Sequence, residues 1–238
     1  MIIEVHENKR VKAKYLIVGF HDVGLVGIIS TRHLIEELGL EQIGGIDIPD
    51  EMLVTTVKEG VSNYPIGIYH GGEVALIFPE IPLPPPSVFP LSQAIMDYAA
   101  RIRCERIISL TGLANPNRLN VKPRPGWIVS QTDIEEMDKL REWGRPLKDG
   151  ILYGPTAALL KSSMVRNPPT VALLADAFPE FPDPGAAAVV LQGLEKVYGI
   201  KVNVEKLLED AEKIKARLQE NVKRAMTVMK EAQPLTYA

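Results

Sequence analysis

The chain has 238 residues, 46% of them hydrophobic, and a formal net charge of −3 at pH 7. This size and composition suit one globular domain with or without an appendage. The slight negative charge provides no basic face for DNA or RNA, so we expect no nucleic acid partner. No apolar run is long enough to span a membrane, and Met1–Lys14 is too charged for a secretory signal. We therefore expect a cytoplasmic protein that has no membrane partner.

The residue types that hold metals or form disulfides are scarce. Cys104 is the only cysteine, which excludes an intramolecular disulfide, and we interpret it as a small packing residue. The four histidines have no ligand-type partner at helical spacing. The sequence therefore predicts no metal site and no cofactor.

The stretch Tyr15–Ile29 is the part of the chain around which we expect the fold to be organised. An apolar run ends at Gly19, as in a strand buried on both faces, and helical spacing begins at Val23. We expect Gly19 to supply positive φ for the sharp turn, and Gly39 to end the helix. The glycines of the turn allow either close packing of helix on strand or a phosphate-binding turn. We favour packing, because the glycine spacing fits no phosphate-binding motif and Asp22 places a negative charge there.

The next part of the chain predicts mostly β structure. Met1–Val11 is typical of an edge strand, and Gly44-Gly45 indicates a bulge in a following strand. Gly71-Gly72 predicts a tight hairpin. The expected strands after the first helix are Gln42–Ile48, Leu53–Val57, Ile66–His70 and Val74–Phe78.

Phe78–Pro90 contains six prolines, which predicts a stiff extended connection without helix. Its apolar residues suit a rigid lid over the sheet or a surface on which a partner docks, and these interpretations remain equal. Ser87 is expected to cap the next helix.

The second half alternates strands and helices, which predicts an α/β protein. We expect Asp183 to cap the helix that begins at Pro184. Thr111-Gly112 should end a strand, and Thr132 should cap a charged helix. The expected elements are the strand Ile107–Leu110, a polar excursion over Asn115–Gly126, the helix Asp133–Trp143, a helix from Gly154-Pro155 and the strand Val171–Ala175.

The final segment predicts a long amphipathic helix from Val204 to about Ala232. Twenty-eight residues correspond to about 42 Å, which is longer than a small domain is wide. Its near-heptad spacing favours self-association, and we therefore separate residues 1–203 as a core domain from residues 204–238 as a helix and flexible tail. The expected oligomer interface is formed by Leu207, Ile214, Leu218 and Val222.

Catalytic residues are harder to find. Asp176, Glu180 and Asp183 follow the last expected core strand, where α/β enzymes place their sites. Each has a simpler interpretation, because Asp183 suits a cap and Asp176 could accept hydrogen bonds from turn amides. No nucleophile, base and oxyanion-binding group converge, so an enzyme is possible but unsupported.

These motifs together resemble the proteasome assembly chaperone 2 family, in its archaeal branch. The resemblance extends from about Val18 to the late helix. It rests on Gly19-Phe20 with Gly24 and Gly27, on the Leu-Thr-Gly end of the strand that begins at Ile107, on Gly154-Pro155, and on Asp183-Pro184 before Ala186-Ala187.

The resemblance implies a three-layer α/β/α sandwich with a mixed, mostly parallel sheet, related to phosphorylase and hydrolase folds, plus the long helix. It also implies a non-catalytic homo-oligomer that binds archaeal proteasome α subunits, or another archaeal protein, through a C-terminal tail. Residues Leu235, Thr236, Tyr237 and Ala238 match this tail, although Thr236 stands at its hydrophobic position. A scaffold for a different archaeal partner, or an enzyme acting on a nucleoside or phosphate ester at the Gly19–Gly27 turn, remains an alternative.

Overall fold

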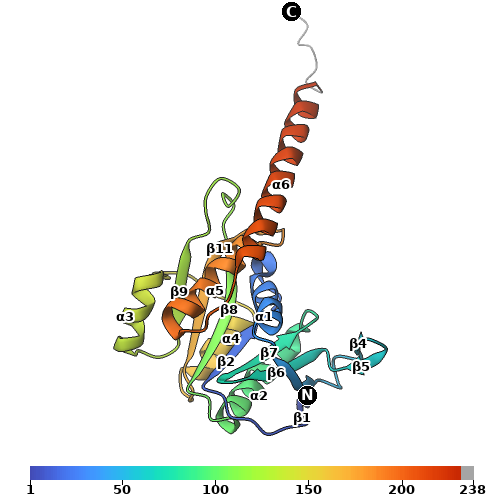
Figure 1. The fold of residues 1–238 in the computed structure, drawn as a ribbon, viewed down its shortest axis with the longest axis vertical. Helices are drawn as coiled ribbons and strands as arrows, with labels where there is room; N and C mark the ends of the chain where they lie inside the picture. The colour runs from blue at the N-terminus through green and yellow to red at the C-terminus, as the bar shows by residue number, and fades with distance from the viewer. Residues whose placement is uncertain (232–238) are drawn as a thin grey trace, which may run out of the picture.

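The computed structural model describes residues 1–231, and the side chains of residues 1–220. A nine-stranded sheet runs through the centre, in the order β1-β3-β6-β7-β2-β8-β11-β9-β10 (Figure 1). Its four central strands run parallel, and the pairs that join them to the outer strands are antiparallel. The strands are β1 (Glu4–Glu7), β2 (Tyr15–Gly19), β3 (Glu41–Asp47), β6 (Ile66–Gly71), β7 (Val74–Pro79), β8 (Arg106–Ala114), β9 (Pro125–Val129), β10 (Arg145–Pro146) and β11 (Thr170–Ala177).

Helices cover both faces of this sheet, which confirms the predicted three-layer sandwich. On one face, Leu191 of α5 packs in a core with Ile17 of β2, and on the other Ile95 of α2 packs with Leu16. Successive residues of one buried strand thus serve two cores. The helices are α1 (Val26–Glu37), α2 (Val88–Arg101), α3 (Ile134–Trp143), α4 (Pro155–Ser163), α5 (Pro184–Tyr198), α6 (Glu205–Glu231) and the 3-10 helices η1 (Val23–Leu25) and η2 (Pro85–Ser87).

The first strand-turn-helix unit has the predicted order of elements, but its glycines have different structural roles from those predicted. The left-handed residues of the turn are Gly24 (φ 66°) and Leu25 (φ 51°). The prediction that Gly19 supplies positive φ is wrong. A Cβ on Gly19 would lie 2.2 Å from the carbonyl oxygen of Gly27, so Gly19 is needed for close packing of helix on strand. Gly39, at φ 57°, follows the helix as predicted.

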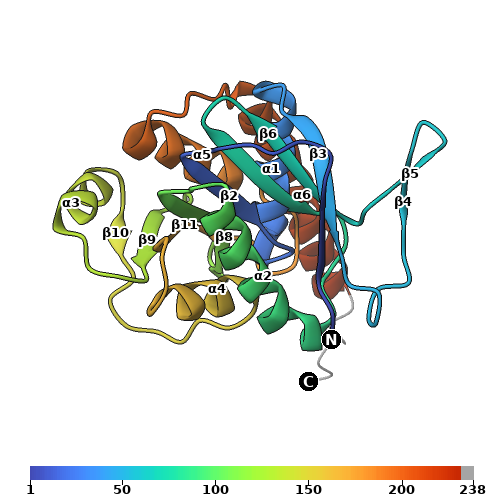
Figure 2. The same ribbon diagram turned by 90° about the horizontal axis from the view of Figure 1, so that it is seen from below.

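The outer strands near the N-terminus agree with the sequence in most respects. β1 pairs antiparallel with β3 at the edge, and the bulge in β3 falls between Gln42 and Gly44. β6 and β7 form the predicted hairpin at Gly71. The predicted strand Leu53–Val57 is wrong. Instead, β4 (Thr56–Lys58) and β5 (Val61–Asn63) form a separate two-stranded ribbon that extends away from the body (Figure 2).

The proline-rich connection is shorter than predicted. Helix α2 begins at Val88 and includes Pro90 in its first turn, where the missing N–H of proline costs no hydrogen bond within the helix. Ser87 lies at the cap position, but its hydroxyl donates to the carbonyl of Pro84 instead of capping the helix. Ile81 and Leu83 pack against the core, as expected of a lid. Phe89 is 55% exposed.

Two further predictions in the second half need correction. Strand β8 continues through Thr111 and Gly112, because it pairs with β11 along its whole length. Asp133, and not Thr132, caps α3 by accepting a hydrogen bond from the amide of Glu136. Strand β9, at one side of the sheet, lies partly inside the expected polar excursion.

Candidate functional site

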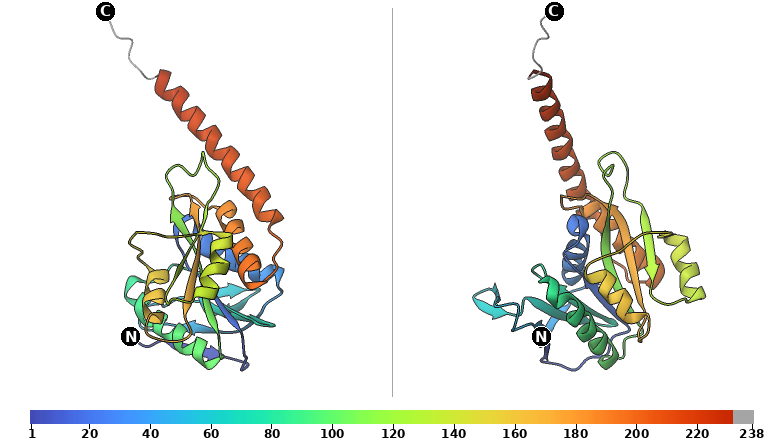
Figure 3. Two further views of the ribbon diagram at one scale, coloured as in Figure 1. Left: turned by 90° about the vertical axis from the view of Figure 1, so that its left-hand side faces the viewer. Right: turned by 180° about the vertical axis from the view of Figure 1, so that it is seen from behind.

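Helix α6 is the feature that distinguishes this fold from a simple sandwich. Its first turn is attached to the body, because the amide of Glu205 donates to Oδ1 of Asn203, and Nε2 of His33 lies 2.5 Å from the carbonyl oxygen of Asn203. Leu207 is 8% exposed and packs in the core with α5. Beyond this base the helix leaves the sandwich and runs outward (Figure 3). The rod therefore ends far from the sheet.

The residues predicted to form an oligomer interface on α6 differ in their surroundings. Leu207 is occupied within its own chain, so its side chain is not available to a partner. Ile214 and Leu218 are partly exposed on the part of the rod that leaves the body. The side chain of Val222 lies outside the described residues, as do all four residues of the predicted tail, Leu235, Thr236, Tyr237 and Ala238.

A buried ion pair lies beside the base of α6. The Nη2 of Arg118 donates to Oδ1 of Asp183 at 3.0 Å, and Nε lies 2.8 Å from Oδ2. Asp183 also accepts from the amides of Ala186 and Phe178, which confirms it as the cap of α5. Both charged side chains are nearly inaccessible to solvent. A Cβ on Gly185 would approach both Arg118 and Ala211 of α6, so this pair sits under the rod.

Asp22 occupies the turn where a phosphate could have bound. Its Oδ1 accepts from the amide of Gly27 at 3.1 Å, and its Oδ2 accepts from the amide of Gly112 at 2.9 Å. Burial raises the pKa of this carboxyl to about 6, and the hydrogen bonds partly oppose the shift. The protein thus supplies its own anion to these donors, as the packing interpretation of the turn requires.

The carboxylates at the end of β11 and in the loop that follows it do not form a catalytic pair. Asp176 contacts the Nε of Arg124 at 2.5 Å and accepts from Nδ2 of Asn115 at 3.0 Å. These partners are side chains, so the expectation that Asp176 binds turn amides is wrong. Glu180 is exposed. The carboxyl edge of the sheet is therefore held together by its own ion pairs.

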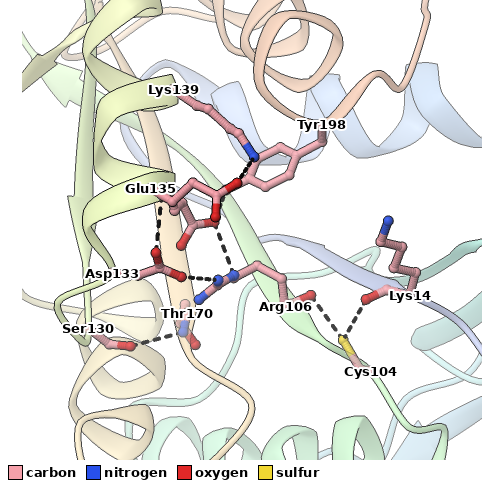
Figure 4. A network of polar contacts seen from close by, with 10 residues as sticks. Lys14, Cys104, Arg106, Ser130, Asp133, Glu135, Lys139, Thr170 and Tyr198 are labelled. Atoms are coloured by element: carbon pink, nitrogen blue, oxygen red, sulfur yellow. Dashed lines mark hydrogen bonds and ion pairs between the residues drawn. The ribbon is translucent and has the colours of Figure 1, made fainter.

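A second polar cluster, which the sequence did not reveal, lies at the opposite edge (Figure 4). Arg106, the first residue of β8, contacts Asp133 at 3.1 Å and Glu136 at 3.0 Å, and the hydroxyl of Tyr198 donates to the same Glu136 oxygen at 2.9 Å. Burial raises the pKa of Glu136 and that of Tyr198. The adjoining cavity has a volume of about 280 Å³.

This cluster joins three elements, because Arg106 belongs to β8, Glu136 to α3 and Tyr198 to the end of α5. The single positive charge of Arg106 lies between the carboxylates of Asp133 and Glu136, so the cluster holds α3 on the sheet. An arginine at the start of a buried strand was the one available sequence signal.

Metal and membrane sites have no support in the part of the chain that the structure describes. Residues with described side chains contain no group of three His, Cys, Asp or Glu placed to hold a metal ion. Among the described helices, none has the length and apolar character needed to cross a bilayer.

These features define a three-layer α/β protein with a projecting C-terminal helix, and comparison with known proteins identifies its class. The model of the PAC2 family matches residues 16–222, so the chain belongs to the PAC2 family. This confirms the resemblance drawn from Gly19-Phe20 and Asp183-Pro184.

Individual relatives agree with this assignment. The crystal structure of Pyrococcus furiosus PbaA, described as an archaeal homologue of proteasome-assembly chaperone, has a TM-score of 0.80 and 28% identity, covering 98% of this chain and 99% of that one. Pyrococcus furiosus PbaB, described as an archaeal proteasome activator, shares the fold at a TM-score of 0.78 and 21% identity, covering 92% and 97%. The uncharacterized protein MJ0106 of Methanocaldococcus jannaschii is 24% identical over 90% of this chain and 87% of its own length.

Proposed function

We propose that this protein is a non-catalytic, homo-oligomeric chaperone or scaffold of proteasome assembly. In this proposal the C-terminal helix and tail bind proteasome α subunits. The observation that carries the proposal is the projection of α6 away from the sandwich (Figure 3). About 20 residues of helix beyond Ala211 extend the chain by roughly 30 Å, which is enough to present the tail to another molecule.

The tail has the chemistry for such binding. Tyr237 offers a large apolar ring and one hydroxyl for a hydrogen bond. Leu235 provides the aliphatic contact that Thr236 does not. The similarity to PbaA, an archaeal homologue of proteasome-assembly chaperone, and to PbaB, an archaeal proteasome activator, supports this choice of partner.

The test is a pull-down with purified archaeal proteasome α subunits. The full chain is compared with a chain that ends at Thr236, and we expect the truncated chain to recover far less of the α subunits. A Lys201→Ala chain serves as a control, since this exposed residue lies in the connection before α6 and outside the proposed contact. Equal recovery by the full and truncated chains would remove the tail from the mechanism.

The alternative partner is tested by the same method. A pull-down from native archaeal lysate separates the proteasome from a different protein as the partner. If the full chain recovers a different protein and no α subunit, the scaffold has another client.

The alternative of an enzyme at the Gly19–Gly27 turn has less support, because Asp22 already accepts from the amides that a phosphate would need. Thermal unfolding with inorganic phosphate, or with a nucleoside, tests it. We expect no rise in the unfolding temperature, since a ligand that binds the folded state would produce one.

A further inference from the structure

Two exposed apolar surfaces lie on different parts of the body, and neither belongs to α6. The first, which we call the arm, comprises residues 53–63, with the ribbon β4–β5 at its end. Leu53 is 94% exposed, Val57 69% and Val61 64%. An isolated two-stranded ribbon is only marginally stable in water, and this one has its apolar side chains in solvent. Such a segment gains stability when another surface covers it.

The second surface, which we call the α4 patch, flanks both ends of α4. Ile151 and Tyr153 precede the helix and are 94% and 87% exposed, and Met164 and Val165 follow it at 63% and 88%. The nine residues of α4 separate the two ends by about 13 Å. This distance suits a short β-ribbon, whose three-residue strands are about 10 Å long.

The arm and the α4 patch are complementary in charge. The arm and its flanks carry Asp50, Glu51 and Glu59 against a single lysine, Lys58. The patch and its flanks carry Lys148, Lys161 and Arg166 against Asp149, and Arg166 also pairs with Asp97 of α2. The arm therefore carries a net negative charge and the patch a net positive charge, which favours contact between the two surfaces.

The two surfaces cannot meet within one chain. The ribbon β4–β5 projects from one side of the molecule, whereas α4 lies on the body, away from the ribbon (Figure 2). A surface that fits a different surface of the same molecule produces head-to-tail association between copies.

We propose that the arm of one copy docks on the α4 patch of the next copy of this chain. This deepens the self-association within the proposed function and assigns it to the sandwich, whereas the proposed proteasome contact belongs to α6 and the tail. The contact is heterologous, so each copy uses one arm and one patch, and α6 remains available to another partner.

The experiment uses two full-length variants. The arm variant carries Val57→Glu with Val61→Glu, and the patch variant carries Ile151→Glu with Val165→Glu. All four side chains are exposed, so folding should be retained, and circular dichroism with thermal unfolding checks it. Light scattering after size-exclusion chromatography then measures the mass of each protein.

We expect the wild-type chain to have the mass of an oligomer and each variant that of a monomer. An equal mixture of the two variants should give a dimer and nothing larger, because only one intact arm and one intact patch remain to pair. Ile134→Glu is the matched control, since Ile134 is 72% exposed on α3 and belongs to neither surface. It should keep the wild-type mass.

Three results would overturn the proposal. These are a monomeric wild-type chain at all concentrations, variants with the wild-type mass, and a mixture of the two variants that gives no dimer. Association of the patch variant by itself would indicate that arms pair with arms. The α-subunit pull-down separates this failure from failure of the proposed function. Loss of oligomer in the arm variant with unchanged recovery of α subunits would support both proposals independently.

Discussion

Arg118 and Asp183 form a nearly inaccessible ion pair in which Nη2 lies 3.0 Å from Oδ1, directly beside the base of α6. Arg118 also lies over the ring of Phe178, with its Cζ 4.9 Å from the ring centroid. The pair joins the loop after β8 to the first turn of α5, on which α6 rests. The ion pair therefore stabilises the part of the body on which the projecting helix rests.

Asp183→Ala tests how much this ion pair contributes to stability. The change removes the cap of α5 and leaves the Arg118 guanidinium buried without its carboxylate. Loss of one partner of a buried pair costs about 3–5 kcal/mol, so we expect a decrease of this size in the free energy of unfolding, measured with urea. Glu135→Ala is the control, because Glu135 is 85% exposed in its pair with Lys139. That change should cost about 0.5 kcal/mol or less.

Asp22→Asn tests the buried carboxyl of the first turn. The pKa of Asp22 is about 6 in the folded state against 3.8 for an ordinary aspartate. The folded state therefore binds the proton more tightly. The stabilisation is complete below pH 3.8 and is lost as the pH rises through 6.

The asparagine variant has no proton to lose in this range. At about 1.4 kcal/mol for each pH unit between the two pKa values, the advantage of wild type over the variant should fall by on the order of 3 kcal/mol as the pH rises. Denaturant titrations of both proteins across this range measure it. A difference that stays constant with pH would contradict the prediction.

Gly27→Ala tests close packing at the start of α1. A Cβ at this position would lie 2.7 Å from the carbonyl oxygen of Leu110 and from backbone atoms of Phe20. Backbone atoms cannot move aside easily, so we expect a loss of about 3 kcal/mol in the free energy of unfolding. In Gly150→Ala the nearest atom is the tip of Leu147, at 3.6 Å. If both variants were equally stable, close packing would not explain this glycine.

Cys104 should be chemically inert in the folded protein. It is 8% exposed, its thiol lies 2.9 Å from the carbonyl oxygen of Arg106, and burial raises its pKa to about 11. Because the thiolate is the reactive form, we expect no alkylation by iodoacetamide at neutral pH until denaturant is added. Mass spectrometry counts the labels. An Ile134→Cys variant, changed at an exposed position, should take up one label in the folded state.

Much of the fold could be predicted because its signals are local. The cap by Asp183, the hairpin at Gly71 and the left-handed Gly39 each depend on a few neighbouring residues. The alternation of strands with helices predicted an α/β protein, and the family resemblance implied the three-layer sandwich. The length of α6 also followed from its own periodicity.

The errors arise where distant residues decide the structure. Thr111 and Gly112 continue β8 because β11 pairs beside them, and nothing in their own sequence indicates that pairing. The role of Gly19 depends on Gly27 approaching it from the next helix. The network around Arg106 gathers side chains from β8, α3 and α5. No spacing of residues along the sequence indicates that these side chains lie close together.

Because α6 is attached to the body by its first turns, a small tilt at its base produces a larger displacement at its outer end. The helix contacts the body near Ala211, where it passes Gly185, and it ends at Glu231. Ala211 and Glu231 are roughly 30 Å apart along the helix, so a tilt of about 10° at Ala211 displaces Glu231 by about 5 Å. Leu207 lies four residues, or about 6 Å, before Ala211, so a shift of about 1 Å at Leu207 corresponds to the movement of about 5 Å at the outer end.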